Sequence, residues 1–448
     1  MNEIQKKACY GNPIVRNPYP GLLETEVFTP NTHPGAAWFP DAAFGLFIHW
    51  GISAADGNYD LSWGMMKRKP HSIDERVGYY GVFTVTRPVP PNVYWARAKE
   101  FDAKNYNPDK WLSAAKKAGI EYAVLTTRHH DGFALWPSKY GDFNTKTHLG
   151  GRDLVREYVD ACRRNGLKVG FYYSPPDWYM EREWMNYSLE EGVFLDADWN
   201  PVEPRMIPIE EKRKIREYNR NQVEELLTEY GQIDLLWFDC VYGSDCIPLS
   251  RIRELQPGIV VNSRGRAKGD FLSADEGRFP KERHDGMWDY CDVFSADTAA
   301  WGYLNYEVYN PSGWVLENLA KTRSWSGNFL VNAGPDAHGE MPSVYYDRMA
   351  ELAGWMKQNG ESVKKASGTD FWPERCNVPV TRNGKTLFLH VHWRVDYPVE
   401  FNDIDEPVSL TLNGKALPYQ YENRTLSFDL PEGDSGLLTR IVRFEEKT

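Results

Sequence analysis

The chain has 448 residues, of which 42% are apolar and 14% aromatic, and its formal net charge is -11. This length is enough for two or three domains of about 100–200 residues each. The acidic balance argues against nucleic acid and anionic membranes as partners, because both favour basic surfaces. No run of ~18 apolar residues is present, so the sequence predicts no membrane span.

The six cysteines and the N-terminal segment leave the redox compartment open. The cysteines lie far apart and form no C-x-x-C pair, so we expect free buried thiols rather than a zinc or redox site. Residues 1–30 contain no apolar signal core, so no signal peptide is visible in this sequence.

The first three quarters of the chain alternate strands with helices. The predicted strands cover residues 44–48, 122–125, 169–173, 235–239, 259–261 and 329–331, and the predicted helices cover 111–118, 154–162, 223–230, 252–255 and 316–325. This alternation predicts a parallel sheet, and its size and strand count favour a (β/α)8 TIM-like barrel. The alternative, a doubly wound open sheet, normally has a glycine-rich phosphate turn after its first strand, and the sequence shows none.

The pattern changes near residue 366. Asn383-Gly384 and Asn413-Gly414 are typical hairpin turns, and short alternating strands flank them. We therefore predict a barrel over residues 1–365 and a C-terminal antiparallel β-sandwich over 366–448, with either a structural or a glycan-binding role. The long segment 180–217 lies between a predicted strand and its helix, so we expect it to shape outer subsites on the catalytic face.

Polar residues follow the predicted strands where the strands end, which is where barrel enzymes carry their active sites. Asp239 ends a buried apolar strand, and Glu276 lies on a later loop. Two carboxyl groups, one ionised and one protonated near neutral pH, are what glycoside hydrolysis needs. The abundant aromatic residues also suit sugar binding. The simpler interpretations are a helix cap or salt-bridge partner for Asp239 and a solvated side chain for Glu276.

A metal site is the competing interpretation of His129-His130-Asp131. Adjacent histidines on a strand point to opposite faces, and no H-x-H or H-E-x-x-H spacing occurs. We therefore expect no metal and no organic cofactor.

Several segments, in this order, resemble α-L-fucosidases of glycoside hydrolase family 29. They are residues 38–51, 122–136, 138–144, 152–155, 172–178, 235–239, 301–303 and 327–336. The resemblance covers about residues 35–365 and implies a retaining exo-α-L-fucosidase, with Asp239 as nucleophile and Glu276 as general acid/base. It also implies a set of sugar-binding side chains, namely His49, Trp63, His129, His130, Tyr172, Tyr173, Trp237, Arg264 and Trp301.

The resemblance implies a fucosylated glycan or oligosaccharide as the partner. It also implies a periplasmic or extracellular location with a trimmed signal, although a cytoplasmic location stays open, as do the linkage preference and the oligomeric state. The alternatives are an α-L-galactosidase on the same scaffold, a non-catalytic glycan-binding barrel and, last, a metal-dependent hydrolase.

The chain departs from the family pattern around the pocket. Residues 61–64 replace a frequent Glu-Trp-Tyr, so a hydroxyl acceptor is missing or is supplied by Asp60. Cys240 follows the nucleophile where the family usually has glycine. Residues 274–276 replace Thr-Pro-Glu, which leaves three reserve candidates for the acid/base role, namely Asp275, Glu282 and Asp285.

Overall fold

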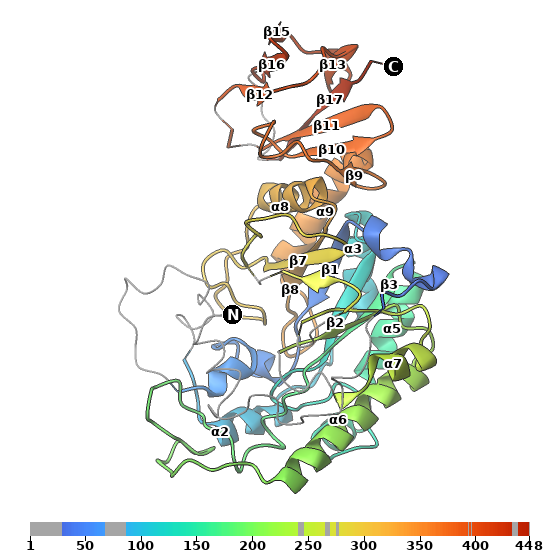
Figure 1. Ribbon diagram of the computed structural model, residues 1–448. Helices are drawn as coiled ribbons and strands as arrows, with labels where there is room; N and C mark the ends of the chain where they lie inside the picture. Colours follow the sequence, from blue (N-terminus) through green and yellow to red (C-terminus); the bar gives the residue numbers. More distant parts are fainter. Residues whose placement is uncertain are drawn as a thin grey trace.

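The computed structural model describes residues 29–67, 87–240, 246–264, 269–274, 277–392, 394–395, 397–431 and 438–447. Eight strands form one parallel sheet in the order β5-β4-β3-β2-β1-β8-β7-β6 (Figure 1). These strands are β1 (Phe44–Ile48), β2 (Tyr122–Arg128), β3 (Lys168–Tyr173), β4 (Leu235–Phe238), β5 (Val260–Val261), β6 (Leu272–Ser273), β7 (Trp288–Val293) and β8 (Asn328–Ala333).

The two edges of this sheet meet, so the predicted barrel is confirmed. A parallel bridge joins Asn262 to Phe271, immediately beyond β5 and before β6. The N–H of Ser263 donates to the carbonyl oxygen of Phe271 at 2.8 Å, and the N–H of Asp270 donates to that of Val261 at 2.7 Å.

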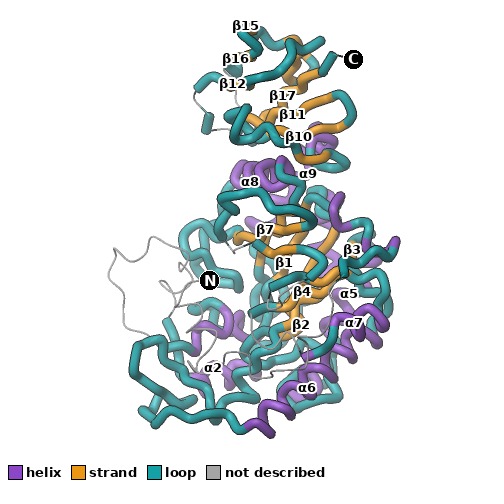
Figure 2. The backbone as a smooth tube through the Cα atoms, in the orientation of Figure 1, coloured by secondary structure: helices purple, strands orange, loops and turns teal. Residues whose placement is uncertain are grey.

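Helices cover the outside of the barrel, as Figure 2 shows. They are α2 (Pro91–Ala96), α3 (Pro108–Lys117), α4 (Thr145–His148), α5 (Leu154–Arg164), α6 (Ile209–Glu229), α7 (Leu249–Leu255), α8 (Ser312–Ser324) and α9 (Ser343–Asn359). In α5, Asp153 caps the first turn by accepting from the N–H of Arg156, and Leu154, Val155 and Tyr158 are buried against the barrel. Gly166, with φ 64°, follows the helix end.

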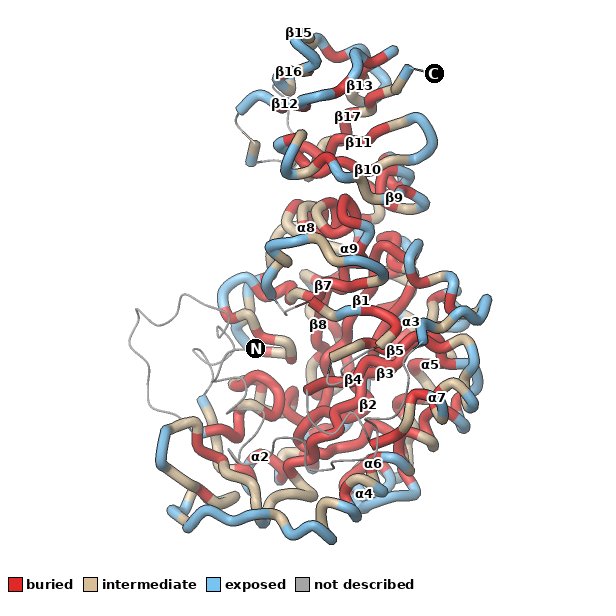
Figure 3. The backbone as a smooth tube through the Cα atoms, viewed as in Figure 1, coloured by how far each residue is buried: buried red, intermediate tan, exposed pale blue. Residues whose placement is uncertain are grey.

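The sequence found six of the eight strands. It missed β6 and β7, and the described residues between β5 and β7 contain no helix that would have marked them. The loop predicted over residues 180–217 ends earlier in the structure, because α6 already begins at Ile209. The strands of the barrel are buried almost throughout (Figure 3).

The C-terminal part forms a six-stranded and a three-stranded antiparallel sheet around a separate apolar core, which confirms the predicted sandwich. Its strands are β9 (Ser367–Gly368), β10 (Val380–Asn383), β11 (Thr386–Val391), β12 (Val399–Phe401), β13 (Ser409–Leu412), β14 (Lys415–Ala416), β15 (Gln420–Glu422), β16 (Thr425–Phe428) and β17 (Arg440–Glu445). It rests on α8 and α9 (Figure 1), where Trp355 Nε1 donates to the carbonyl of Thr439 at 2.7 Å.

Two further sequence predictions concern cysteines and membranes. The five cysteines within the described residues are free and buried, as predicted. Among the helices that the structure describes, none combines the length and the hydropathy needed to cross a membrane.

Candidate active site

Side chains that face the barrel interior lie two residues apart along each strand. Phe47, Tyr172 and Trp237 share one buried cluster inside the barrel, and Tyr172 pairs with Trp237 in the β3–β4 register. His49 and Asp239 follow Phe47 and Trp237 by two residues, so both belong to the inward-facing series. They lie just beyond β1 and β4, at the C-terminal end where barrel enzymes carry their active sites.

Asp239 is only 7% exposed and is surrounded by hydrogen-bond donors. Its Oδ2 accepts from the hydroxyl of Tyr172 at 2.6 Å, and its Oδ1 accepts from Nε of Arg264 at 3.0 Å. The backbone N–H of Cys240 donates to the same Oδ1 at 2.6 Å. Nε2 of His130 lies 3.5 Å from Oδ2. Both carboxylate oxygens are therefore held in place.

These neighbours decide the charge of Asp239. Burial alone would raise the pKa of this carboxyl group, but the charge of Arg264 and the hydrogen bond from Tyr172 outweigh burial. Together they hold the pKa well below its usual range. Asp239 is therefore an ionised carboxylate at neutral pH.

Asn332 on β8 sets the tautomer of His49. Its Nδ2 donates to the carbonyl oxygen of Trp301 at 2.7 Å, so its Oδ1 faces Nδ1 of His49 at 2.6 Å. A carboxamide oxygen only accepts, so Nδ1 carries the proton and Nε2 is an acceptor. Burial lowers the pKa of His49 to about 4, which keeps the imidazole neutral at neutral pH.

The tautomer of His130 follows from the same kind of reasoning. Ser174 Oγ donates its proton to the carbonyl oxygen of Pro176 at 2.9 Å, so it accepts from Nδ1 of His130 at 2.5 Å. Burial lowers the pKa of His130 to about 4. His130 thus presents Nε2 as an acceptor beside Asp239, as His49 does on β1.

His129 is bonded to one of the residues that differ from the family pattern. Its Nδ1 is hydrogen-bonded to Oγ of Ser62, and burial lowers its pKa well below the usual value. Its ring stacks on Tyr172 with a centroid separation of 5.7 Å and lies 4.2 Å from the ring of His130.

His129, His130 and Asp239 also form a group that could bind a metal, because their ligand atoms lie within 4.8 Å of one another. The prediction that the two histidines point to opposite faces is therefore wrong, since both follow the end of β2 at Arg128. A cation there would lie beside the guanidinium of Arg264, which is already paired with Asp239 at 3.0 Å. This like-charge repulsion makes the cluster a poor divalent-cation site.

Aromatic rings line the polar groups. Trp301 packs edge-on against Phe47 at 6.1 Å, and Trp63 contacts the rings of His130 and Trp178 edge-on at 5.8 and 5.3 Å. Flat apolar faces beside hydrogen-bonding imidazoles suit a sugar, whose C–H faces pack on aromatic rings.

Trp237 and Tyr172 form the buried floor beneath Asp239. Their rings stack at 5.7 Å with an interplanar angle of 14°, and the guanidinium of Arg264 lies 5.4 Å from the Trp237 ring. Among the described residues, the buried Nε1 of Trp237 has no hydrogen-bond partner. An unpaired buried donor costs free energy, which a ligand oxygen at that atom would recover.

Tyr173 lies on the opposite face of β3 from Tyr172. Its hydroxyl donates to Oδ1 of Asn219 and Oε1 of Gln222 on α6, both at 3.1 Å, and Arg128 stacks over its ring at 4.3 Å. The sequence assigned both tyrosines to the pocket, but the structure places Tyr173 in the layer between the sheet and α6.

Asp60 holds the backbone beside Trp301. It is completely buried, and its Oδ1 accepts from the backbone N–H groups of Trp301 and Gly302 at 2.9 and 2.7 Å. This oxygen is therefore occupied in positioning Trp301, whereas the sequence suggested Asp60 as a substitute hydroxyl acceptor.

Cys240 occupies a position that favours glycine. Its φ is 60°, in the left-handed region that side chains with a Cβ adopt at a cost. Its Sγ lies 3.8 Å from Nε2 of His130. The positive φ at this position explains why glycine usually follows the nucleophile. In this chain Cys240 adopts the same conformation at a cost in free energy.

Glu276, the predicted acid/base, and Asp275 lie outside the described residues. The flanking residues Ala274 and Gly277 are described, and their N–H groups donate to carbonyl oxygens of β7 at 2.9 and 3.1 Å.

The other two reserve acids lie away from Asp239. Glu282 and Asp285 are exposed, and Asp285 precedes the first residue of β7, at the N-terminal end of the barrel. Arg283 between them is paired with Glu374 at 2.8 Å, on the side of the C-terminal part.

Sequence reasoning missed three residues that position the histidines, namely Asn332, Ser62 and Ser174. Asn332 was detectable, because it lies two residues beyond the inward-facing Leu330 in β8. Ser62 lies in a short 3-10 helix (Leu61–Met65) and Ser174 follows the end of β3, so no strand alternation shows which way either side chain points.

Comparisons with known proteins identify the family of the chain. The family profile described as alpha-L-fucosidase matches residues 23–361. Tissue α-L-fucosidase of Mus musculus is 26% identical over 393 residues, which cover 82% of this chain and 81% of that protein. Plasma α-L-fucosidase of Homo sapiens is 27% identical over 350 residues, covering 73% and 68%.

Solved structures give the same result. Alpha-L-fucosidase isoenzyme 1 from Paenibacillus thiaminolyticus is 29% identical, with a TM-score of 0.73 over 93% of this chain and 99% of that chain. A Thermotoga maritima α-fucosidase in complex with fucose is 23% identical, covers 91% and 96%, and has a TM-score of 0.67, which shows the shared fold. Because the profile match spans more than half of its length, the chain belongs to the α-L-fucosidase family, glycoside hydrolase family 29.

Proposed function

We propose that this glycoside hydrolase is an exo-α-L-fucosidase that releases terminal α-L-fucosyl residues from glycans with retention of configuration. The observation that carries the proposal is Asp239, a buried and ionised carboxylate fixed by Tyr172 and Arg264 at the barrel mouth. A retaining glycosidase needs such a carboxylate as its nucleophile. Family membership supports the choice of sugar.

The proposed reaction has two displacements. In the first, Asp239 attacks the anomeric carbon, the bond from that carbon to the leaving oxygen breaks, and Glu276 protonates the leaving oxygen. In the second, water gives a proton to Glu276 and attacks the same carbon, and the ester bond to Asp239 breaks. The mechanism requires the two carboxyl groups to lie ~5–5.5 Å apart.

The neutral imidazoles would bind the hydroxyl groups of the sugar. His49 and His130 each present Nε2 as an acceptor, and His129 stacks on Tyr172 beside them. The indole N–H of Trp237 supplies a donor. Acceptors and a donor around one carboxylate match a polyhydroxylated ring.

Trp301 favours fucose over L-galactose, which carries an additional hydroxyl at C6. Its ring packs on Phe47 within the apolar interior cluster, so this wall of the site suits a methyl group. Burying a hydroxyl against it without a partner would cost free energy. The proposed partner is a fucosylated glycan or oligosaccharide, and a periplasmic or extracellular enzyme fits this role.

Hydrolysis of 4-nitrophenyl α-L-fucoside tests the proposal in the wild type, Asp239→Ala and Glu276→Ala. We expect both variants to lose turnover with the fold intact. Azide should restore activity in both, giving the α-L-fucosyl azide with Glu276→Ala and the inverted β-L-fucosyl azide with Asp239→Ala, because only the latter reacts in one displacement.

Four outcomes would contradict parts of this proposal. Normal turnover by Asp239→Ala would remove the nucleophile assignment, and the α azide from that variant would do the same. Faster hydrolysis of the aryl α-L-galactoside than of the aryl α-L-fucoside would make L-galactose the preferred sugar. Binding of fucosides without any turnover by the wild type would indicate a glycan-binding barrel.

A further inference from the structure

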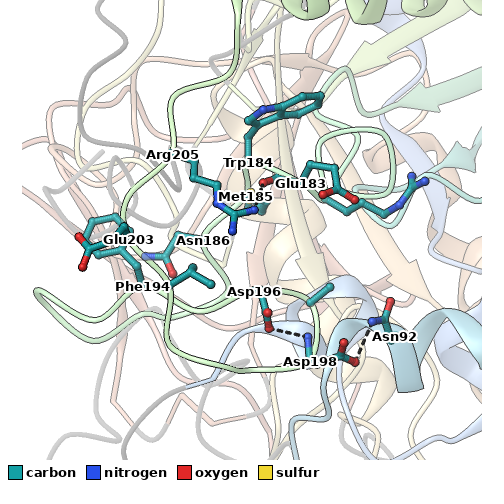
Figure 4. A pocket seen from close by; sticks show the side chains of 13 residues that line it. Asn92, Glu183, Trp184, Met185, Asn186, Phe194, Asp196, Asp198, Glu203 and Arg205 are labelled. Atoms are coloured by element: carbon teal, nitrogen blue, oxygen red, sulfur yellow. Dashed lines mark hydrogen bonds between the residues drawn. The ribbon is translucent and has the colours of Figure 1, made fainter.

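A cavity lies in the segment between β3 and α6 (Figure 4). Its volume is about 260 Å³, and it is lined by residues between 182 and 205 together with Asn92 of α2. These residues belong to connections that follow β1 and β3, so the cavity lies on the same end of the barrel as Asp239. In Figure 1 the green loops of this segment run beside α2, away from the C-terminal sheets.

The chain segment that supplies most of the lining is joined to the segment that carries Trp63. The N–H of Lys67 donates to the carbonyl of Tyr187 at 2.8 Å, and the N–H of Leu189 donates to that of Lys67 at 2.9 Å. Nε1 of Trp199 donates to the carbonyl of Met65 at 3.1 Å. The segment that forms the cavity is therefore tied by hydrogen bonds to the segment that carries Trp63.

Hydrogen bonds hold the polar side chains of the cavity in fixed positions. Nδ2 of Asn92 donates to Oδ1 of Asp198 at 2.7 Å, which links α2 to the segment. Oδ1 of Asn186 accepts from the N–H groups of Ser188 and Leu195, both at 3.0 Å. A site built in advance binds with less loss of entropy.

The lining combines a flat aromatic ring with many hydrogen-bonding groups. Figure 4 shows the indole of Trp184 at one edge and the carboxylates of Asp196 and Asp198 at the opposite edge. Arg205 lies between them in this view, and Phe194 lies to the left. An indole ring for C–H groups, and carboxylates and amides for hydroxyls, is the combination that recognises sugars.

We propose that this cavity is a subsite for a neutral sugar unit of the glycan that carries the fucosyl residue. This inference rests on the proposed fucosidase function. The cavity volume is close to the lower limit of ligand pockets, about 300 Å³, so it suits a single sugar ring. Its lining carries four carboxylates and two guanidinium groups, and this excess of negative charge disfavours acidic sugars.

The test compares substrates that differ only beyond the fucosyl residue. kcat/KM is measured for 4-nitrophenyl α-L-fucoside, 2′-fucosyllactose and 3-fucosyllactose with the wild type, Trp184→Ala, Trp184→Phe and the control Tyr397→Ala. Tyr397 is 50% exposed in the C-terminal part. Binding of N-acetyllactosamine and N-acetylneuraminic acid to each protein is measured by calorimetry.

We expect Trp184→Ala to lose about tenfold in kcat/KM on a fucosyllactose or in affinity for N-acetyllactosamine, equivalent to ~1.4 kcal/mol. The aryl fucoside should change less than twofold, Trp184→Phe should recover most of the loss, and N-acetylneuraminic acid should bind more weakly. Equal changes on all substrates, or no effect of Trp184 on either turnover or saccharide binding, would overturn the subsite. Absence of aryl fucoside hydrolysis by the wild type would instead reject the fucosidase function.

Discussion

The hydroxyl of Tyr172 donates a 2.6 Å hydrogen bond to Oδ2 of Asp239, while Arg264 binds the other oxygen. The bond stabilises the ionised form of the carboxyl group and also fixes its direction. It places a residue that stacks on Trp237 in direct contact with the proposed nucleophile. Tyr172 therefore connects the aromatic floor of the site to the proposed nucleophile.

Tyr172→Phe should move the acid limb of the kcat/KM profile to higher pH. The pKa of Asp239 is depressed, and loss of the donor lets it rise toward its usual value of ~3.9, so less carboxylate is present in acid. We also expect a loss of kcat on the order of tenfold. Tyr173→Phe is the matched control, since its hydroxyl binds α6, and it should leave the profile unchanged. An unchanged profile in Tyr172→Phe would contradict this role.

Asn332→Asp should weaken substrate binding at neutral pH. A carboxylate beside Nδ1 raises the pKa of His49 from about 4, so the imidazole becomes protonated and Nε2 stops accepting. We expect KM for the aryl fucoside to rise severalfold, with partial recovery at alkaline pH. Asn328→Asp is the control, because Asn328 binds Phe39 and Ala43 at the other end of β8. A KM without pH dependence in Asn332→Asp would count against the tautomer assignment.

Cys240→Gly should raise thermal stability and retain activity. Glycine adopts a φ of 60° without the Cβ clash, which is worth up to about 1 kcal/mol. Cys240→Val should lower stability, because a branched side chain is poorly accommodated at positive φ. Calorimetric melting temperatures check both. A Cys240→Gly protein less stable than the wild type would show that the sulfur contact with His130 outweighs the backbone cost.

The free energy of unfolding should fall as the pH falls from about 6.5 toward 4. Burial lowers the pKa of His49 and His130 to about 4 and that of His390 to about 3, against ~6.5 in the unfolded chain. The unfolded chain thus binds protons in this range that the folded chain does not, so stability is present above it and is lost below.

His390→Gln isolates one part of this dependence without touching the active site, because His390 is buried in the C-terminal part. We expect the pH slope to decrease by up to ~1.4 kcal/mol per pH unit, with kcat unchanged. Urea unfolding at several pH values between 5 and 7 measures it. An identical slope in the variant and the wild type would be inconsistent with a neutral buried His390.

Much of the fold was readable from the sequence because most strands are continuous apolar runs. β1 and β4 were predicted within one residue, since all their side chains are buried. β6 has only two residues, and β7 contains Asp289 and Asp292, so neither gives an apolar run. Among the described residues, no helix lies between β5 and β7, so the alternation of strand and helix does not mark β6 or β7.

The candidate site was partly readable for a similar reason. Alternate side chains of a strand face the barrel interior, so Tyr172 points into the barrel and Tyr173 points away from it. The same alternation along β8 places Asn332 in the interior, two residues after Leu330. Two partners of the histidines, Ser62 and Ser174, lie outside the strands, however, and their positions depend on tertiary packing. Asp60 illustrates the same limit, because its backbone partners lie about 240 residues away in the chain.

Asp239 is proposed to form the covalent bond to the sugar, and this bond can be trapped chemically. The enzyme is incubated with 2-deoxy-2-fluoro-fucosyl fluoride, digested with a protease and analysed by mass spectrometry. We predict a single fluorofucosyl adduct on Asp239, with its formation prevented in Asp239→Asn. An adduct on another carboxylate, or hydrolysis with inversion of configuration, would contradict the account.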